Sequence, residues 1–341
     1  MHMANELLSV PVAAGTFAIA SLGLGLVCRK VKEAATTDQL GLMGILGAFV
    51  FSAQMINLPL PGLPGTSGHL IGAVLLAILL GPHAGALIVS SIVIVQCLLF
   101  QDGGLLALGC NMINMALVPA YLGYALYRLI LHQATDTWRF NLAVMTAALI
   151  TVLVSAILVP IQTAVSGVLT LPFRTFVWTM VSVHLVIGLM EGLITIAVLA
   201  YVKQIKPDIL SLNQKSTCDN RSRLLVATLA IFTLLLCAVF SLYASDKPDG
   251  LEWSYAERPE QPEFQSVVLP HEQADTVETL QSKYTLLPAY TKRPTPIGHI
   301  NAQDVALSRG WTSFAGVMGA LTTMIVIWGV AWCLRKKRAT A

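Results

Sequence analysis

The sequence predicts an all-α, polytopic helical membrane protein in which a seven-span core is followed by a two-span hairpin that carries an external segment. Of the 341 residues, 55% are hydrophobic and only 11% are charged, and the mean hydropathy is +0.72. Soluble domains carry about 25% charged residues. Apolar runs of bilayer length, about 20 residues, recur along the chain. The spans are expected to be helices because backbone in lipid must satisfy its own hydrogen bonds, and the alternating pattern of a membrane barrel is absent.

Nine apolar runs are the expected membrane crossings, with an uncertainty of about 2–4 residues at each boundary. The third and fourth runs are short and are separated by Gly81-Pro82, so they form either a tight helical pair or a partly re-entrant segment. The runs lie near residues 10–28, 40–57, 67–82, 84–100, 104–129, 140–165, 176–202, 224–243 and 310–334.

The distribution of basic residues predicts the orientation in the membrane. Short loops on one face hold fourteen Lys and Arg residues, whereas the opposite short loops hold only Arg174. Because basic residues accumulate in cytoplasmic loops, we expect a protein of the cytoplasmic (inner) membrane with its amino terminus outside and its carboxyl terminus in the cytoplasm. Positive charge follows the first span and does not precede it, so we expect no cleaved signal peptide and an intact Met1 terminus. The fourteen basic residues are Arg29, Lys30, Lys32, Arg128, Arg139, Lys203, Lys206, Lys215, Arg221, Arg223 and the run 335–338.

We expect three parts along the chain. Residues 1–203 form a metal-binding membrane core, residues 204–223 a polar cytoplasmic linker, and residues 224–341 an accessory transmembrane hairpin. The hairpin encloses the external segment 244–308, which is rich in Pro, Glu and Gln and is expected to be loosely folded or disordered on its own. The six cysteines include none in this segment and no C-x-x-C pair, so neither a disulfide framework nor a thiolate metal site is indicated.

The first two residues, Met1-His2, form a candidate metal chelator. An α-amine and an imidazole have ordinary pKa values of about 8 and about 6.5, so both give up a proton readily to a metal ion. Together with the amide nitrogen between them, once the metal has deprotonated it, they supply three nitrogens in nearly one plane. A fourth nitrogen completes a square, which favours Ni²⁺ or Cu²⁺. The alternative interpretation is that His2 is an incidental second residue without a role.

His69 is the candidate fourth ligand. It follows the Pro/Gly-rich stretch 59–68 at the expected outer start of the third span, where Ser67 is a suitable N-cap. The predicted orientation places His69 and the amino terminus on the same face, so four nitrogens from two parts of the chain can converge. The alternative interpretation is an interfacial histidine that reaches water.

Polar residues within the predicted spans are candidates for supporting roles, because such residues are costly in a membrane and are frequently functional. His184 and Glu191 lie on one face of the seventh span, where they either couple conformational changes or fix packing. Glu191 is expected to pair with His184 or with a polar group of the fifth span. The other candidates either orient the two ligand histidines or join helices by hydrogen bonds; they are Gln54, Asn57, Gln101, Asp102, Asn111 and Asn114.

Two enzyme motifs are missing from the sequence. The P-loop pattern G-x-x-x-x-G-K-[ST] does not occur, and neither does the zinc hydrolase pattern H-E-x-x-H. The chain is therefore expected to be a transporter subunit without its own ATPase motif and not an enzyme. Transport driven by ATP would require a partner.

Several short motifs occur in a fixed order over about 200 residues. They include Met1-His2-Met3, Ser67-Gly68-His69, Gly81-Pro82, Gln101-Asp102-Gly103-Gly104, Asn111 with Asn114, and His184 with Glu191. This series resembles the cobalt/nickel substrate-binding component of energy-coupling-factor transporters, the CbiM/NikM type. A later motif, Pro248-Asp249-Gly250-Leu251-Glu252, resembles the small CbiN/NikN accessory component, here fused to the core. The opening departs from the commoner Met-His-Ile-Pro-Asp-Gly, because Asn5 takes the position of the acid.

The resemblance implies a site made of the terminal amine, the amide nitrogen and ring of His2, and the ring of His69, with Met1-His2 folded back into the core. It implies import of Ni²⁺, or of Co²⁺ for cobalamin synthesis, as a transported substrate without a covalent cofactor. It also implies two kinds of partner, a transmembrane coupling (T) subunit and ATP-binding cassette ATPase subunits. The alternative is a proton-coupled secondary metal transporter that uses Glu191 and His184.

Overall fold

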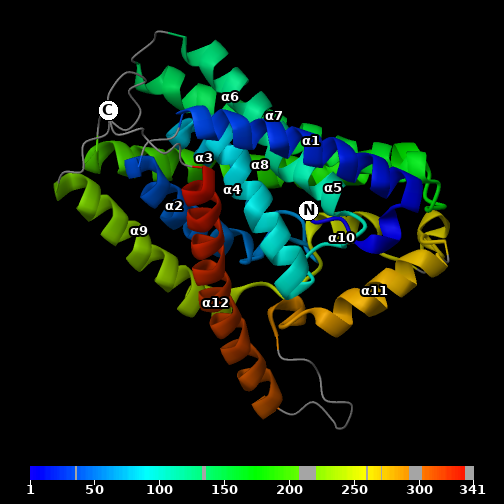
Figure 1. Cartoon of the computed structure of the whole chain (residues 1–341). Coiled ribbons are helices and arrows are strands. Elements are labelled where there is room, and N and C mark those ends of the chain that lie inside the picture. The colour runs from blue at the N-terminus through cyan, green and yellow to red at the C-terminus, as the bar shows by residue number, and fades with distance from the viewer. Residues whose placement is uncertain are drawn as a thin grey trace.

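The structure, a computed structural model, describes residues 1–34, 37–132, 136–206, 220–258, 260–269, 271–291 and 302–334. These residues are almost entirely helical, with one short antiparallel pair of strands, β1 (Leu58–Pro59) and β2 (Ser67–Gly68) (Figure 1). The α-helices are α1 Val10–Ala34, α2 Thr37–Gln54, α3 Ala73–Leu80, α4 Pro82–Val95, α5 Leu108–Asn111, α6 Val118–Leu131, α7 Thr137–Ser166, α8 Phe173–Ile205, α9 Asn220–Ala238, α10 Gly250–Tyr255, α11 Glu272–Tyr284 and α12 Ala302–Leu334. Shorter helical segments are η1 Asn5–Leu7, η2 Gln96–Phe100, η3 Met112–Leu117, η5 Phe240–Tyr243, η6 Pro262–Phe264 and η7 Pro288–Tyr290.

Seven helices in the described part of the chain are long and apolar enough to cross a membrane. They correspond to seven of the nine runs expected from the sequence. The second expected run is a shorter apolar helix, Gly41–Gln54, and the third contains the eight-residue α3. The seven candidate spans are Val10–Glu33, Pro82–Phe100, Leu108–Leu131, Thr137–Ser166, Phe173–Ile205, Arg221–Tyr243 and Gly310–Leu334.

The third expected run is only partly helical because of the sequence that precedes Ala73. Strands β1 and β2 pair in this region, and Gly72 has φ of +72°, a left-handed conformation that favours glycine. Helix α3 therefore begins at Ala73 and ends before Gly81. Helix α4 begins at once with Pro82 in its first turn and packs against α3. Of the two alternatives that the sequence left open, the structure has the helical pair.

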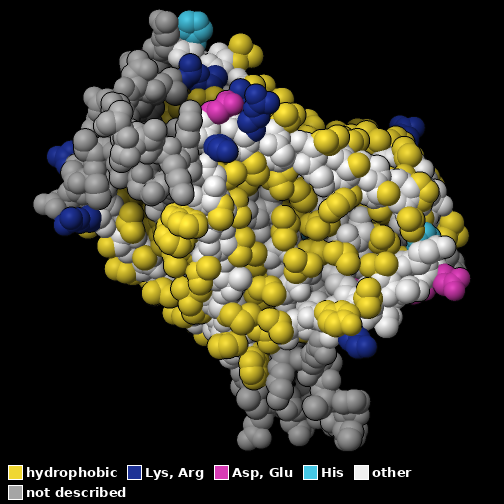
Figure 2. Space-filling view, in the orientation of Figure 1, with side chains coloured by type: hydrophobic (Ala, Val, Ile, Leu, Met, Phe, Trp, Pro, Cys, Tyr) yellow, Lys and Arg dark blue, Asp and Glu magenta, His cyan; other side chains and the backbone are white. Residues whose placement is uncertain are grey.

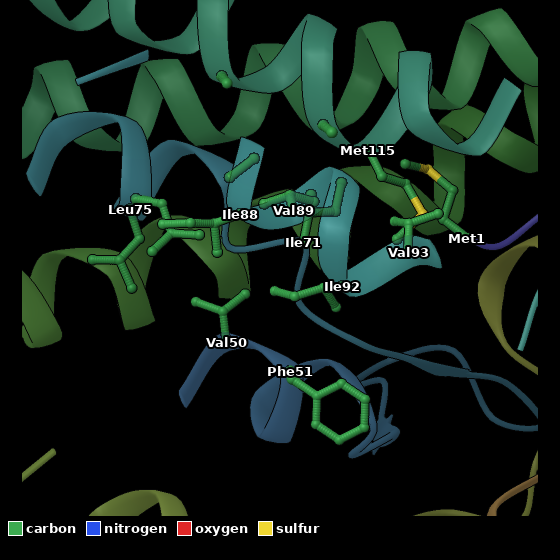
Figure 3. Packing of buried hydrophobic residues seen from close by; sticks show 14 of the residues in the cluster. Met1, Val50, Phe51, Ile71, Leu75, Ile88, Val89, Ile92, Val93 and Met115 are labelled. Atoms are coloured by element: carbon green, nitrogen blue, oxygen red, sulfur yellow. The ribbon is translucent and has the colours of Figure 1, made fainter. Parts of the chain in front are cut away.

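Branched apolar side chains of α2, α3 and α4 fill the centre of the core. Val50, Leu75 and Ile88 are buried there. Figure 3 shows Val50 below the α4 side chains, and at the other end of the cluster it shows Met1 beside Met115. The amino terminus thus contributes to the core and does not extend into solvent.

The accessory hairpin packs on the core through α2. Helix α12 contacts α2 along its length, and α9 contacts both (Figure 1). Glycine is required at two of these contacts. A Cβ added at Gly47 would lie 2.2 Å from Ile327 Cδ1, and one added at Gly319 would lie 2.2 Å from Phe51 Cζ. Small residues of this kind let helices approach closely inside a membrane.

The outer surface of the helical bundle is apolar. Leu22 of α1 is 73% exposed and Leu129 of α6 is 74% exposed. In Figure 2, hydrophobic side chains cover the middle of the visible face, whereas Lys and Arg gather toward its upper part. An exposed apolar belt of this size suits contact with lipid. The chain is a multi-pass helical membrane protein.

The part of residues 244–308 that the structure describes is ordered against the core. This part contains α10 and α11 and lies across one end of the core (Figure 1). Backbone hydrogen bonds fix it there: the Ser245 amide donates to the Asn57 carbonyl over 2.8 Å, and the Leu287 amide donates to the Leu99 carbonyl over 3.1 Å. Its order comes from these contacts with the core. Residues 292–301, most of the expected linker 204–223 and the basic run 335–338 lie outside the described residues.

Candidate metal centre

The first residues of the chain run inside the protein. Met1, His2 and Met3 are 5%, 9% and 0% exposed. The Met3 amide donates to Asn111 Oδ1 over 2.8 Å, and the Met3 carbonyl accepts from the Gly104 amide, also over 2.8 Å. Because both backbone groups of Met3 are satisfied by the core, the two residues before it are held in a fixed position.

The amino terminus, His2 and His69 meet at this position. The Met1 ammonium donates to His69 Nε2 over 2.6 Å. The His2 and His69 rings stack, with centroids 5.0 Å apart and planes inclined by 22°. The His2 amide nitrogen belongs to the peptide bond between Met1 and His2, so it lies close to the terminal amine. The structure thus places the terminal amine against His69 Nε2 and the His2 ring beside the His69 ring.

Asp249 completes this cluster from the accessory segment. Its Oδ2 accepts from the Met1 ammonium over 2.6 Å and lies 3.7 Å from His69 Nε2. Burial by itself would raise the pKa of Asp249, but the terminal ammonium and His69 lower that pKa well below its usual range. Burial, and then the neighbouring ammonium, lower the pKa of His69. The His69 ring is therefore neutral at pH 7, with a nitrogen lone pair that can bind a cation.

Asp102 contacts the other side of His2. Its Oδ1 lies 3.0 Å from His2 Nδ1, and the Tyr290 hydroxyl donates to its Oδ2 over 2.5 Å. Burial by itself would raise the pKa of Asp102, but the charge and hydrogen bond of His2 outweigh burial and lower it. Gln96 Oε1 lies 3.0 Å from His2 Nε2 and belongs to the π-helical segment η2, a helix irregularity that is frequent at functional sites.

Glu191 holds the loop that presents His69. Its two carboxylate oxygens accept from the Ile71 and Gly72 amides, each over 2.9 Å. These amides stand at the start of α3, where the helix dipole also favours a negative charge. The expectation that Glu191 pairs with His184 or with the fifth span was wrong, because the loop before α3 reaches Glu191 and offers it two backbone donors.

Four of the predicted supporting residues lie at the site, and one of them, Asp102, is described above. Gln54, Asn57 and Gln101 line the same cavity as His2 and His69. Gln54 Nε2 donates to the Ile71 carbonyl over 2.6 Å, so it contacts the His69 loop. The Gln101 side chain donates to Glu278 of α11 and thereby joins the core to the accessory segment.

The other predicted residues serve the surroundings of the site or the helix packing. Asn111 binds the backbone of Met3, as described above. Asn114 exchanges two side-chain hydrogen bonds with Gln162, over 2.8 Å and 2.9 Å, and so joins η3 to α7. His184 Nδ1 lies 2.8 Å from the Met180 carbonyl of its own helix. Neither Asn114 nor His184 contacts His2 or His69 in the described contacts.

The sequence analysis did not name Asp249 as a residue of the site. Asp249 caps α10: its Oδ1 accepts from the Leu251 and Glu252 amides, each over 2.8 Å, and the Glu252 carboxylate accepts from the Asp249 amide over 3.0 Å. An acid followed three residues later by Glu is the capping-box pattern, so this helix start could have been found. Nothing in the sequence indicates that the same carboxylate reaches Met1.

The candidate centre relies on backbone nitrogens. In the part of the chain that the structure describes, no group of three or more His, Cys, Asp or Glu side chains could hold a metal ion. The cluster at Met1 differs in kind, because two of its four nitrogens are the terminal amine and the His2 amide. An all-nitrogen donor set of this kind suits Ni²⁺, Co²⁺ or Cu²⁺ better than Mg²⁺ or Ca²⁺, which prefer oxygen.

Comparison with known proteins identifies the family of this chain. Residues 2–209 match the model of the cobalt uptake substrate-specific transmembrane region, and residues 223–336 match the PDGLE domain. The chain belongs to the cobalt uptake substrate-specific transmembrane family. The resemblance to a CbiM/NikM-type core with a fused accessory region is thereby confirmed.

Relatives in this family carry transport names. The chain is 33% identical to a putative fused nickel transport protein NikMN of Archaeoglobus fulgidus, over 73% of this chain and 80% of the relative. It is 32% identical to a probable fused nickel transport protein LarMN of Lactiplantibacillus plantarum, over 74% and 78%. A crystal structure of a transition metal transporter matches with a TM-score of 0.51 and 32% identity, over 60% of this chain and 93% of that one. The protein is a metal transporter, and a metal ion is its substrate.

Proposed function

We propose that this chain captures Ni²⁺, or alternatively Co²⁺, at the terminal amine, the His2 amide and the two imidazoles, and delivers the ion across the membrane. The observation that carries the proposal is the buried contact of 2.6 Å between the Met1 nitrogen and His69 Nε2. Metal–nitrogen bonds of about 2.0 Å place adjacent corners of a square about 2.8 Å apart. The two atoms are therefore already spaced as neighbouring ligands of one ion.

The site can accept a divalent ion without a change in net charge. Binding requires the terminal ammonium to become an amine and the His2 amide to lose its proton. Counted with both imidazole rings neutral, two protons leave as two positive charges enter, so the ligand cluster has a charge of +1 before and after. The Asp249 carboxylate, 2.6 Å from the terminal nitrogen, balances that charge in both cases. For His2 to bind through Nδ1, the ion must take the place of its contact with Asp102.

Nickel is favoured slightly over cobalt because four nitrogens in a plane suit Ni²⁺. Cu²⁺ has a higher intrinsic affinity for such donors, so selection against copper depends on geometry or on the supply of free ions. The fused relatives are named as nickel transport proteins, which supports the preference for nickel over cobalt. Cobalt uptake for cobalamin synthesis is the close alternative.

The energy for transport is proposed to come from partners in an energy-coupling-factor importer of the inner membrane. A transmembrane coupling subunit and two ATPase subunits would supply it, since the sequence contains no P-loop. The amino terminus would face outside and the carboxyl terminus the cytoplasm. The competing proton relay through Glu191 and His184 is disfavoured, because the Glu191 carboxylate is engaged by two backbone amides.

Two experiments test this proposal. Elemental analysis of purified protein with its native terminus should find about one Ni or Co per chain, and insertion of two Gly residues between Met1 and His2 should abolish binding because it moves the His2 ring away from the terminal amine. Two Gly residues inserted after His132, at the end of α6, are the matched control and should leave binding normal. Equal metal content in all three proteins would refute the terminal chelate. Uptake in proteoliposomes should require the ATPase partners and should resist a protonophore.

A further inference from the structure

The two ring nitrogens of His2 have different roles in the proposed chelate. Nδ1 lies on the side of the ring that joins the backbone, so it can close a small chelate ring with the His2 amide nitrogen. Nε2 lies on the far side of the ring and cannot reach an ion that this amide also binds. A ring nitrogen that carries a proton has no lone pair to offer to a metal. The chelate therefore needs neutral His2 with its proton on Nε2.

Gln96 provides the acceptor for a proton on His2 Nε2. Its Oε1 lies 3.0 Å from that nitrogen, and because an amide oxygen can only accept, His2 Nε2 is the donor. Gln96 is 0% exposed and His2 is 9% exposed, so water scarcely competes for this contact. A buried N–H group that lacks an acceptor is costly. The contact thus favours the tautomer of His2 that leaves Nδ1 for the metal ion.

His69 shows the same arrangement with a backbone acceptor. Its Nδ1 lies 3.2 Å from the Leu70 carbonyl oxygen, while its Nε2 lies 2.6 Å from the Met1 nitrogen. The carbonyl oxygen can only accept, so Nδ1 carries the proton and Nε2 keeps a lone pair. Histidines that bind metals generally donate their second N–H in this manner. For His2 the corresponding acceptor is a side chain 94 positions away along the chain.

The backbone of Gln96 also fixes the residue on the other side of the His2 ring. Gln96 begins the π-helical segment η2, and its carbonyl accepts from the Asp102 amide over 3.1 Å. The Asp102 carboxylate is the group that contacts His2 Nδ1. A change of the Gln96 side chain removes the contact at Nε2 and leaves this backbone hydrogen bond in place. The two contacts of the His2 ring can therefore be separated by mutation.

We propose that Gln96 is a positioning residue that holds the proton of His2 on Nε2 and so directs Nδ1 to the metal ion. The proposal deepens the proposed function and rests on it, because only a chelate at Met1-His2 requires Nδ1. Gln96 is not itself a ligand, since its Oε1 is engaged at Nε2. Loss of this acceptor lowers Ni²⁺ affinity although every ligand is still present.

The test compares two substitutions of Gln96 in the full chain with its native terminus, with Ni²⁺ alone as the probe. Gln96→Met has a similar length but no acceptor, and isothermal titration should show Ni²⁺ affinity about 10–100-fold lower. Gln96→Glu keeps an acceptor oxygen and should restore most of the affinity. Gln162→Met is the matched control, because Gln162 is a half-buried amide that bonds Asn114, and it should bind Ni²⁺ normally.

Nitrogen-15 NMR of histidine-labelled, Ni²⁺-loaded protein gives a readout that a merely structural role of Gln96 would not move. In the native protein and in Gln96→Glu, His2 should show a metal-bound Nδ1 and a slowly exchanging Nε2 proton. In Gln96→Met that proton should exchange rapidly. The His69 signals should stay unchanged in all three proteins, because the acceptor of His69 is the Leu70 carbonyl.

Native affinity and native His2 signals in Gln96→Met would overturn the role of Gln96, as would an equal loss of affinity in Gln162→Met. The native protein decides the matter even if Gln96→Met does not fold: a His2 Nε2 proton that exchanges as fast as that of the exposed His132 would also overturn it. If Ni²⁺ leaves the His2 signals of the native protein unmoved, the nitrogen site fails and the role of Gln96 fails with it. The two failures are thereby distinguished.

Discussion

The two sides of the metal centre differ in chemistry and in origin. The core side offers nitrogens from Met1, His2 and His69, whereas the accessory side offers the carboxylate of Asp249 and its neighbours on α10 and α11. Nitrogen donors select a transition metal, while carboxylates that stay outside the ligand set supply charge without choosing the metal. Under the proposed function, recognition would lie in the core and electrostatic attraction largely in the fused segment. Each prediction below changes one side and leaves the other intact.

The largest effect is expected from His69→Ala. Loss of one of four ligands should reduce Ni²⁺ affinity at least about a thousandfold, measured by isothermal titration, because the remaining three nitrogens cannot close the square. His69 lies in a loop, so the thermal unfolding temperature should change little. His132→Ala, an exposed histidine, is the control and should bind Ni²⁺ normally. Normal Ni²⁺ affinity in His69→Ala would refute the proposed four-nitrogen site.

Asp249→Asn should weaken Ni²⁺ binding about 10–100-fold, the usual cost of removing a group that supports metal ligands. The variant keeps the shape and the helix cap but loses the charge 2.6 Å from the terminal nitrogen. Asp246→Asn, at an exposed acid, is the matched control. An Asp249→Asn protein with full affinity would show that the accessory side contributes no charge to the metal centre.

Glu191→Gln separates a positioning role from a proton relay. Gln can accept only one of the two backbone hydrogen bonds that Glu191 now accepts, so the His69 loop should loosen and Ni²⁺ affinity should fall about tenfold. Affinity by titration and ATP-dependent uptake in proteoliposomes should decrease together. Full affinity combined with abolished uptake would support a relay, which is the outcome that the observed contacts disfavour.

Tyr290→Phe should have the smallest effect. It removes the hydroxyl that donates to Asp102 over 2.5 Å, and a hydrogen bond to a charged group contributes about 1.5–3 kcal/mol, less when water can replace it. In the proposed site, metal binding replaces the contact between Asp102 and His2. We therefore expect Tyr290→Phe to change Ni²⁺ affinity by less than tenfold. Tyr284→Phe, which is 70% exposed, is the control. A loss as large as that of Asp249→Asn would mean that Asp102 is part of the metal centre itself.

The sequence predicted features that depend on local composition. Hydropathy alone located the seven helices that can cross a membrane, since each span is a continuous apolar run. The nearness of the amino terminus to His69 was expected from the predicted orientation, and the ligand set of Met1, His2 and His69 stays a prediction. These inferences needed no knowledge of which helices touch.

Features that depend on contacts between distant segments could not be predicted. The sequence of residues 244–291 is polar and has few long apolar runs, and the described part of it is ordered by backbone hydrogen bonds to the core, such as that between Ser245 and Asn57. The partner of Glu191 was missed because Ile71 and Gly72 contribute only backbone amides. Asp249 was visible as a capping residue, but its contact with Met1 spans 248 positions of the chain.

X-ray absorption at the nickel edge, on protein loaded with Ni²⁺ at its native terminus, examines the ligand set directly. Four nitrogens at the terminus, His2 and His69 should give four-coordinate, planar Ni²⁺ with nitrogen neighbours only, and a planar ion of this kind is diamagnetic. A six-coordinate, paramagnetic Ni²⁺ with oxygen neighbours would place the ion among the carboxylates of the cavity and would refute the terminal nitrogen site.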